Sequence, residues 1–271
     1  MVRSVDRFVE TSDGGKIFAS QAGVGSDLVL LNAGAMDLRM WDSNLGALAA
    51  GHRVTRYDDR GTGTRSAKPV RPWSFTRDLL AVLDALDVAR PVLVGSSDGG
   101  RKALDFAVAH PDRVSGLILV GTAMYLPDPD PEDRAALAAL LHALTPRQHA
   151  VDRGDFAAAA SHDLNVWSPR TTPEQRARIQ EMYADSPGFF AGWPAEPLPE
   201  ARPGIEHLGL VQAPTTVVVG EHETDFTRRC ALRISHGVSG TRRIDVPGAD
   251  HFVNLTRPDA FHQLVTEFRP A

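Results

Sequence analysis

The chain of 271 residues is poor in cysteine: Cys230 is the only one, so no disulfide can form within the chain. Because stable disulfides belong to oxidising compartments, this scarcity favours the reducing cytoplasm. Cys230 lies in Phe226–Leu232, a segment predicted to be helical, without a glycine turn that would expose a thiol. We therefore interpret Cys230 as an ordinary helix residue and not as a nucleophile.

Long apolar runs and an excess of basic residues are also missing. No stretch approaches the roughly 20 apolar residues that span a bilayer. Charges at Arg3, Asp6 and Arg7 stand where a secretory signal peptide needs an apolar core, so we expect no signal peptide. Lys and Arg number 29 against 34 Asp and Glu, a formal net charge of −5. Because nucleic acids and anionic membranes are bound by basic faces, we predict neither as a partner.

Short apolar runs that alternate with helical segments are the main feature present. Each run is almost continuously apolar or β-branched, as is typical of strands covered on both faces. The runs are Asp27–Leu31, Arg53–Tyr57, Pro91–Val94, Gly116–Val120 and Thr215–Val219. Between them, the spacing predicts helices over Ser74–Leu86, with Ser74 as the N-cap, and over Gly99–His110, where Pro111 stops the helix. Such alternation predicts βαβ units and a mainly parallel sheet.

The pattern changes at the front and in the middle of the chain. Alternating segments around Asp13–Gly15 predict an antiparallel hairpin that opens the sheet. Residues 125–213 contain no convincing strand, and prolines punctuate alanine- and leucine-rich stretches such as Asp133–Leu144. This region is too long for a plain loop, so we predict a helical cap. The cap would divide the core into residues 1–124 and 214–271.

A motif with the spacing Gly-x-Ser-x-Gly, Gly95–Gly99, stands directly between a predicted strand and a predicted helix. In this context it predicts a nucleophile elbow, a tight turn that presents a serine and needs small neighbours two residues away. The spacing selects Ser97 over Ser96 as the nucleophile, and Asp98 in the second variable position cannot replace it. The start of the following helix offers N–H groups to an oxyanion.

Among the ten histidines, His251 is the predicted general base. It follows a predicted strand and the Pro247-Gly248 turn, where a loop can bring it to the sheet edge that carries the elbow. The sequence contains no His-x-x-x-His pair and no cluster of cysteine and histidine. We therefore expect no metal site.

Together these motifs resemble the α/β-hydrolase superfamily, over almost the whole chain outside the predicted cap. The likeness lies in Leu30–Gly34 with Arg39–Asp42, Tyr57–Ser66, Val94–Gly100, and Pro247–Phe252 with Arg257–Asp259. The resemblance implies an α/β fold with a mainly parallel, doubly wound sheet of eight strands and an inserted helical cap. It also implies a catalytic triad in the chain order serine, acid, histidine, and no cofactor.

By this resemblance, the triad acid should follow the strand at Thr215–Val219. The family usually carries the acid three residues beyond the glycine that ends this strand, which here is Glu223. The segment is one residue shorter than in related hydrolases, so Asp225 stays open as an alternative. The carboxylate that is not the triad acid would cap the next helix.

The resemblance also implies an oxyanion hole, made by the backbone N–H of Asp98 with that of Gly34 or Ala33. Two departures from the family lie here. Asn32-Ala33 replaces the usual His-Gly, and a carboxylate follows the nucleophile directly. The swap keeps the backbone donors but changes the side chain that shapes the loop, and the Asp98 charge would oppose a nearby oxyanion.

The predicted function is that of a serine hydrolase acting on a small-molecule carboxylic ester, lactone or related carbonyl compound through an acyl-enzyme. Two alternatives stay open: a non-hydrolytic cyclase or lyase of a biosynthetic pathway, which Asn32 and Asp98 motivate, and a non-catalytic small-molecule receptor. The cap has apolar side chains that either line a pocket over Ser97 or pack the cap against itself: Leu137, Leu141, Trp167, Phe189, Phe190 and Trp193. The sequence determines neither the particular substrate nor the oligomeric state.

Overall fold

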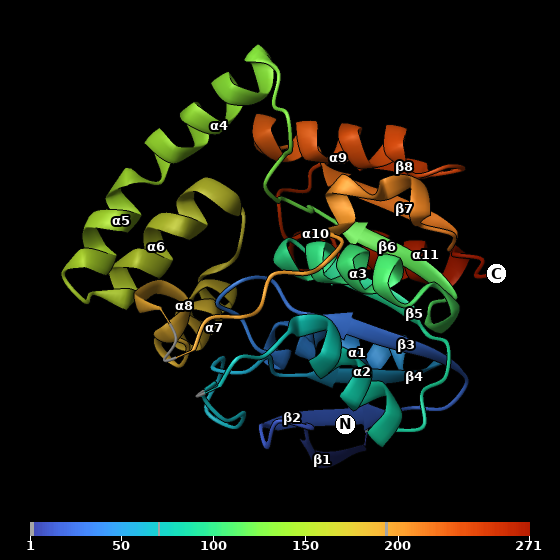
Figure 1. Cartoon of the computed structure of the whole chain (residues 1–271). Coiled ribbons are helices and arrows are strands. Elements are labelled where there is room, and N and C mark those ends of the chain that lie inside the picture. Colours follow the sequence, from blue (N-terminus) through green and yellow to red (C-terminus); the bar gives the residue numbers. More distant parts are fainter. Residues whose placement is uncertain (1–2, 70, 193–194) are drawn as a thin grey trace.

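An eight-stranded sheet forms the centre of the computed structural model, which describes residues 3–69, 71–192 and 195–271 (Figure 1). Its strands are β1 (Ser4–Glu10), β2 (Lys16–Ala22), β3 (Ser26–Leu31), β4 (His52–Tyr57), β5 (Val92–Ser96), β6 (Gly116–Val120), β7 (Thr215–Gly220) and β8 (Arg242–Val246). Their order across the sheet is β1-β2-β4-β3-β5-β6-β7-β8. Strand β2 pairs antiparallel with β1 and with β4, and the other pairs are parallel. The predicted mainly parallel sheet and its opening hairpin are confirmed.

Helices cover both faces of this sheet, which makes it doubly wound (Figure 1). On one face lie α2 (Phe75–Ala85), α3 (Asp98–Ala109) and α9 (Asp225–Gly237); on the other lie α1 (Asp42–Leu48), α10 (Val253–Thr256) and α11 (Pro258–Glu267). Successive strand residues point to opposite faces. Val29 and Leu31 of β3 therefore join the first core cluster, and Leu28 and Leu30 join the second. This explains why the sequence of the strand is apolar without alternation.

The two helices predicted next to the elbow are present with small shifts. Helix α2 starts at Phe75, and Ser74 occupies the N-cap position with extended backbone. Its hydroxyl donates to Glu200 Oε1 at 2.9 Å, however, and makes no capping hydrogen bond. Helix α3 starts one residue earlier than predicted, at Asp98, and ends at Ala109 ahead of Pro111. The earlier start matters because it makes Asp98 the first helical residue after Ser97.

Among the described residues, five α-helices and two short 3-10 helices lie between β6 and β7, in the region predicted to form the cap (Figure 1); the α-helices form its bulk. They are α4 (Pro131–Ala143), α5 (Thr145–Asp152), α6 (Phe156–Trp167), α7 (Pro173–Ala184) and α8 (Gly188–Ala191). Helices α5, α6 and α7 pack on one another, whereas α4 packs on α9 of the core. Arg229 of α9 pairs with Asp130 and Glu132 at the start of α4. Because α4 belongs to the cap region in sequence but packs on the core, the division into residues 1–124, 125–213 and 214–271 stays a prediction.

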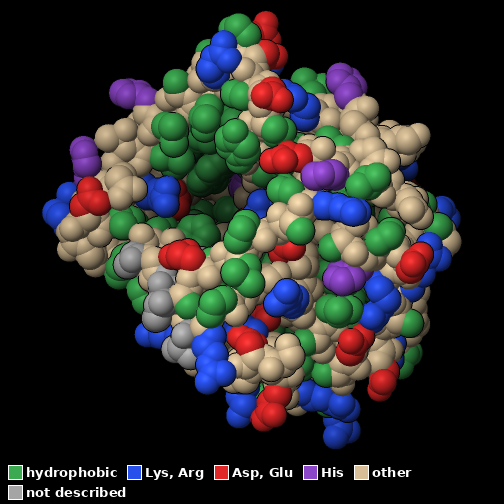
Figure 2. All heavy atoms as spheres, viewed as in Figure 1, with side chains coloured by type: hydrophobic (Ala, Val, Ile, Leu, Met, Phe, Trp, Pro, Cys, Tyr) green, Lys and Arg blue, Asp and Glu red, His purple; other side chains and the backbone are tan. Residues whose placement is uncertain are grey.

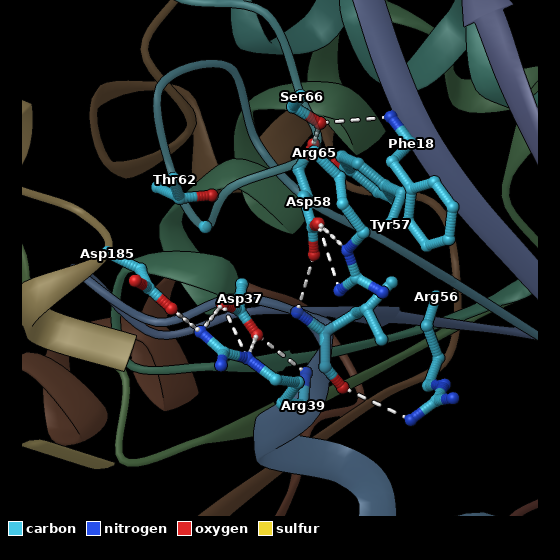
Figure 3. Close-up of polar contacts among 12 residues, drawn as sticks. Phe18, Asp37, Arg39, Arg56, Tyr57, Asp58, Thr62, Arg65, Ser66 and Asp185 are labelled. Atoms are coloured by element: carbon cyan, nitrogen blue, oxygen red, sulfur yellow. Dashed lines mark hydrogen bonds and ion pairs between the residues drawn. The ribbon is translucent and has the colours of Figure 1, made fainter. Parts of the chain in front are cut away.

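Two loops at the carboxyl ends of β3 and β4 are held together by buried charges (Figure 3). Asp58, directly after β4, is fully buried and accepts the Leu38 N–H at 2.9 Å and Arg65 Nε at 3.2 Å. Arg39 pairs with buried Asp37 and reaches Asp185, just beyond α7, at 2.6 Å. These contacts join the sheet, both loops and the cap.

Burial raises the pKa of Asp58 to about 7, although the Leu38 N–H acts in the opposite direction. Between its ordinary pKa and about 7, the folded protein therefore holds a proton that the unfolded chain has lost. This stabilisation is complete below about pH 4 and is lost as the pH rises through 7, by at most about 1.4 kcal/mol per pH unit.

We expect Asp58→Asn, which stays neutral, to show a flatter dependence of the unfolding free energy on pH. Urea unfolding of both proteins from pH 5 to 8 measures this, and parallel curves would contradict it.

Candidate active site

The turn between β5 and α3 presents Ser97 in a strained conformation, with φ 53° and ψ −116°. A positive φ is unfavourable for a residue with a Cβ and persists only where the surroundings impose it. Here the Ser97 N–H donates to Val120 O at 2.8 Å, and Ser97 O accepts the Gly100 N–H at 2.9 Å. Strand β6 and the first turn of α3 thus hold the turn from both sides.

The glycines of the motif are required because backbones approach closely at this turn. A Cβ on Gly95 would collide with the carbonyl oxygen of Gly99, and a Cβ on Gly99 with the carbonyl oxygen of Leu31. Both obstacles are backbone atoms, which cannot rotate away. The predicted need for small neighbours two residues from Ser97 is therefore met by the structure.

We expect Gly99→Ala to lower the free energy of unfolding by about 2 kcal/mol or more, because relieving the clash shifts β3 or α3. Gly46→Ala in α1 is the matched control, since a Cβ there meets no atom within 4 Å and alanine favours a helix. Urea denaturation compares the two variants with the parent. Equal stabilities of the two variants would contradict the requirement for glycine.

His251 lies in the loop after β8 and forms a buried pair with Glu223, which follows β7. His251 Nδ1 is 2.8 Å from Glu223 Oε2, and the two residues are 2% and 7% exposed. A carboxylate only accepts hydrogen bonds, so the proton of the ring lies on Nδ1, and Nε2 keeps a free lone pair. The ring also packs against Trp167, 4.6 Å between centroids. This arrangement is that of an oriented general base.

The two candidate acids are thus placed differently. Glu223 contacts His251, whereas Asp225 is the exposed first residue of α9, where a negative charge favours the helix dipole. Glu221, also close in sequence, is exposed and accepts the Gly248 N–H at 2.7 Å. The geometry brings Glu223 to the histidine and leaves Asp225 at a helix start.

Two backbone donors lie beside Ser97. The Asp98 N–H belongs to the first residue of α3, which has no intrahelical acceptor. Of the two candidates after β3, Ala33 N–H donates to Met40 Sδ at 3.3 Å, while Gly34 N–H has no acceptor within the described part of the chain. Gly34 and Asp98 line the same cavity as Ser97 and are therefore the available pair for an oxyanion.

Asn32 stands where the family usually has a histidine, and its side-chain amide makes the hydrogen bonds that hold the loop after β3. Its Nδ2 donates to Tyr57 O at 2.7 Å, and its Oδ1 accepts Trp41 Nε1 at 3.0 Å. Asn32 is buried, so these bonds fix the loop that carries Gly34 to β4 and to the helical turn behind it. The departure in sequence leaves the loop anchored.

The carboxylate of Asp98 is paired with two cations. It lies 2.7 Å from Arg101 Nε and 2.8 Å from Lys102 Nζ, and Lys102 also pairs with buried Asp59 at 2.8 Å. Burial by itself would raise the pKa of Asp98, but Lys102 and Arg101 outweigh it and hold the pKa of this carboxyl below its usual range. The negative charge beside the nucleophile is therefore held by two ion pairs, in which Arg101 also contacts Asp105 and Lys102 also contacts Asp59.

Ser97, His251, Gly34 and Asp98 line one cavity of about 200 Å³ between the core and the cap. Figure 2 shows a hollow bordered mainly by hydrophobic side chains between the cap helices and the core. The remaining wall consists of Ala33, Ala123, Leu144, Arg147, Asp163, Trp167, Tyr183, Phe189 and Phe252. A small substrate under the cap would thus meet the serine, the histidine and both N–H groups together.

The apolar cap residues named from the sequence divide into two sets. Trp167 and Phe189 line the cavity. Leu137 instead packs in a cluster with Cys230 of α9, and Leu141 is 59% exposed. Phe190 packs on Phe189 and Tyr183, and Trp193 lies outside the described residues.

Sequence reasoning missed Asp250, which anchors the histidine loop. This fully buried carboxylate accepts Ser168 Oγ at 2.7 Å and the Arg170 N–H at 3.0 Å, both from the cap. It also missed three polar residues of the cavity wall, Arg147, Asp163 and Tyr183. They come from three different helices, and no spacing along the chain connects them.

Cys230 is buried in α9, and burial raises the pKa of its thiol to about 11, as expected of a structural residue. Among the described residues, no three His, Cys, Asp or Glu side chains gather as they would around a metal ion. Over the same residues, no helix has the length and apolarity needed to cross a membrane.

The fold and this site are those of an α/β hydrolase. A family model described as alpha/beta hydrolase fold matches residues 28–258, so the chain belongs to this family. The superfamily expected from the motifs is thereby confirmed.

Similar proteins are hydrolases. A protein of Variovorax paradoxus strain S110, provisionally named carbamate hydrolase RutD, is 29% identical, with 89% of this chain and 91% of that protein covered. The 2-hydroxy-6-oxononadienedioate/2-hydroxy-6-oxononatrienedioate hydrolase of Cupriavidus pinatubonensis strain JMP 134 / LMG 1197 is 28% identical, with 97% and 94% covered. The crystal structure of the enol-lactonase from Burkholderia xenovorans LB400 superposes with a TM-score of 0.75 at 25% identity, over 96% and 98% of the chains. The protein is accordingly a hydrolase of this fold, and its predicted esterase or lactonase type is confirmed.

Proposed function

We propose that this hydrolase cleaves a small-molecule carboxylic ester, lactone or related carbonyl compound through an acyl-enzyme on Ser97. The observation that carries the proposal is the buried pair of His251 and Glu223, whose histidine lines the same cavity as the strained serine. A buried carboxylate that fixes the ring, beside a serine on an elbow, is the arrangement that activates a hydroxyl for acyl transfer.

The reaction follows from the placement of these groups. His251 Nε2 takes the proton of Ser97 Oγ as the oxygen attacks the carbonyl carbon, and the N–H groups of Gly34 and Asp98 stabilise the oxyanion. The protonated imidazole then gives its proton to the leaving group, and the acyl-enzyme forms. Water then loses a proton to the same nitrogen as it attacks the acyl carbon. The bond from this carbon to Oγ breaks, Oγ takes the proton back from His251, and the carboxylic acid is released. Glu223 keeps the ring oriented and stabilises its charged form.

Three further features support this reading. The cavity of about 200 Å³ suits a small molecule. Asp98, which motivated a cyclase or lyase, is compensated by Lys102 and Arg101 and does not oppose an oxyanion with a free charge. The named substrates of the relatives, a carbamate and an enol lactone among them, contain a carbonyl carbon that a serine can attack.

The first test is labelling with a fluorophosphonate, followed by intact mass and peptide mapping. We expect one adduct, on Ser97, which Ser97→Ala abolishes and His251→Ala suppresses. Ser96→Ala is the matched control and should keep the adduct, because the Ser96 side chain is buried beside the nucleophile. In turnover of an aryl ester, Ser97→Ala should lose about 10⁴-fold or more in kcat. No adduct on the folded protein would overturn the proposal, and activity surviving in Ser97→Ala would favour the cyclase or lyase.

The second test distinguishes the two carboxylates. Glu223→Gln keeps the shape but removes the charge that stabilises the imidazolium, so kcat should fall by about 10²- to 10⁴-fold. Asp225→Asn, exposed at the start of α9, should stay within about twofold of the parent. Steady-state kinetics on one ester, with folding checked by circular dichroism, compares them. The reverse ranking would assign the triad acid to Asp225.

A further inference from the structure

The cap contributes a polar cluster to the cavity wall that the steps above do not use. Arg147 of α5, Asp163 of α6 and Tyr183 of α7 line the cavity together with Ser97 and His251. Charged side chains in a largely apolar wall are costly unless they are paired or bind a ligand. The hydrogen bonds and ion pairs within this cluster therefore indicate which of its polar groups are left for a ligand to bind.

The pair of Arg147 and Asp163 is loose. Arg147 Nε lies 3.5 Å from Asp163 Oδ1, and both atoms are buried without a hydrogen bond to any described residue. The other carboxylate oxygen, Oδ2, accepts the Tyr183 hydroxyl at 3.1 Å. Tyr183 thus holds one oxygen of Asp163, and the pair with Asp163 leaves most N–H donors of Arg147 without a hydrogen bond.

The accessible member of the pair is the cation. The Arg147 side chain is 24% exposed and that of Asp163 7%. The guanidinium lies 5.4 Å from the ring centroid of Phe190. Nε is its atom nearest to Asp163, and no hydrogen bond joins either terminal nitrogen to a residue that the structure describes. An arginine fixed over an aromatic ring, with free parallel donors, matches the two oxygens of a carboxylate.

We propose that Arg147 binds a carboxylate of the substrate, so that the enzyme prefers esters or lactones that carry an anionic carboxylate apart from the scissile carbonyl. This inference rests on the proposed hydrolase function, because it assigns the substrate class of the same cavity. Asp163 and Tyr183 position the guanidinium. The charge on Asp163 also limits how strongly an anion binds, and its removal should tighten binding.

Two matched pairs of esters test the preference. In the first pair, the mono-4-nitrophenyl ester of glutaric acid carries the charge in its acyl part, and its neutral partner is the same compound with the free carboxylate methylated. In the second pair, 4-acetoxybenzoate carries the charge in its leaving group, and its neutral partner is methyl 4-acetoxybenzoate. In one of the pairs, we expect kcat/KM for the anion to exceed that for the neutral ester about 10- to 100-fold. A preference in neither pair would overturn the inference.

Variants of the cluster should shift this preference in opposite directions. Arg147→Met should reduce the ratio of anionic to neutral kcat/KM at least tenfold, chiefly through KM, while Asp163→Asn should lower KM for the anion. If Arg147→Met folds poorly because Asp163 loses its partner, the double variant Arg147→Met with Asp163→Asn replaces it in the test. The double variant leaves neither charge of the pair under the cap and should show the same reduced ratio. Arg153→Met, exposed at the end of the same helix, is the control and should keep the parent ratio. Equal losses on both esters would indicate a merely structural role.

Binding of glutarate to Ser97→Ala, measured by calorimetry, separates this inference from the proposed function. Binding that Arg147→Met abolishes supports the carboxylate site, even if no ester is turned over. Labelling of Ser97 and ester turnover without an anionic preference would leave the hydrolase standing and overturn the inference. Absence of both labelling and glutarate binding would overturn both.

Discussion

The backbone turn at Ser97 is the constraint on which the rest of the site depends. A φ of 53° at a serine is tolerated because β6 and the first turn of α3 hydrogen-bond to it on both sides. This turn requires glycine at positions 95 and 99, where neighbouring backbones leave no room for a Cβ. In return, the serine side chain and the first N–H of α3 both reach the cavity. Packing of a fully buried strand against a helix thus fixes the position of one half-buried hydroxyl.

Paired charges complete the site, some between elements and some within one helix. Glu223 after β7 contacts His251 after β8, and Lys102 of α3 pairs with Asp98 of the same helix and with Asp59 after β4. Such pairs are stable inside a protein only when the geometry satisfies both members. The parallel sheet provides that geometry, because the carboxyl ends of β4, β5, β7 and β8 lie along one edge. The loose pair in the cap, Arg147 with Asp163, departs from this pattern.

Local signals made the core predictable. Apolar runs, the Asp13–Gly15 turn and the elbow depend on neighbours within a few residues, and their positions agree with the structure. Local signals could not show whether Glu223 or Asp225 contacts His251. Both follow the same strand, and the direction of each side chain depends on where the chain turns next. Leu137 and Leu141 show the same limit: both are apolar and lie four residues apart in α4, yet Leu137 packs on α9 and Leu141 is exposed.

The sequence by itself determined the parallel sheet and the turn at Gly95–Gly99, and it predicted Ser97 as nucleophile and His251 as base, because strand periodicity and the Gly-x-Ser-x-Gly spacing are encoded in adjacent residues. Only the tertiary structure decided which acid contacts His251, which N–H after β3 remains free, and that Asn32 anchors the loop after β3. It alone brought Arg147, Asp163 and Tyr183 to one cavity. The physical reason is that these contacts join residues that are not neighbours in the chain, from 7 positions apart for Ala33 and Met40 to 28 for Glu223 and His251. Their distance is set by how the elements pack and not by any local preference of the chain.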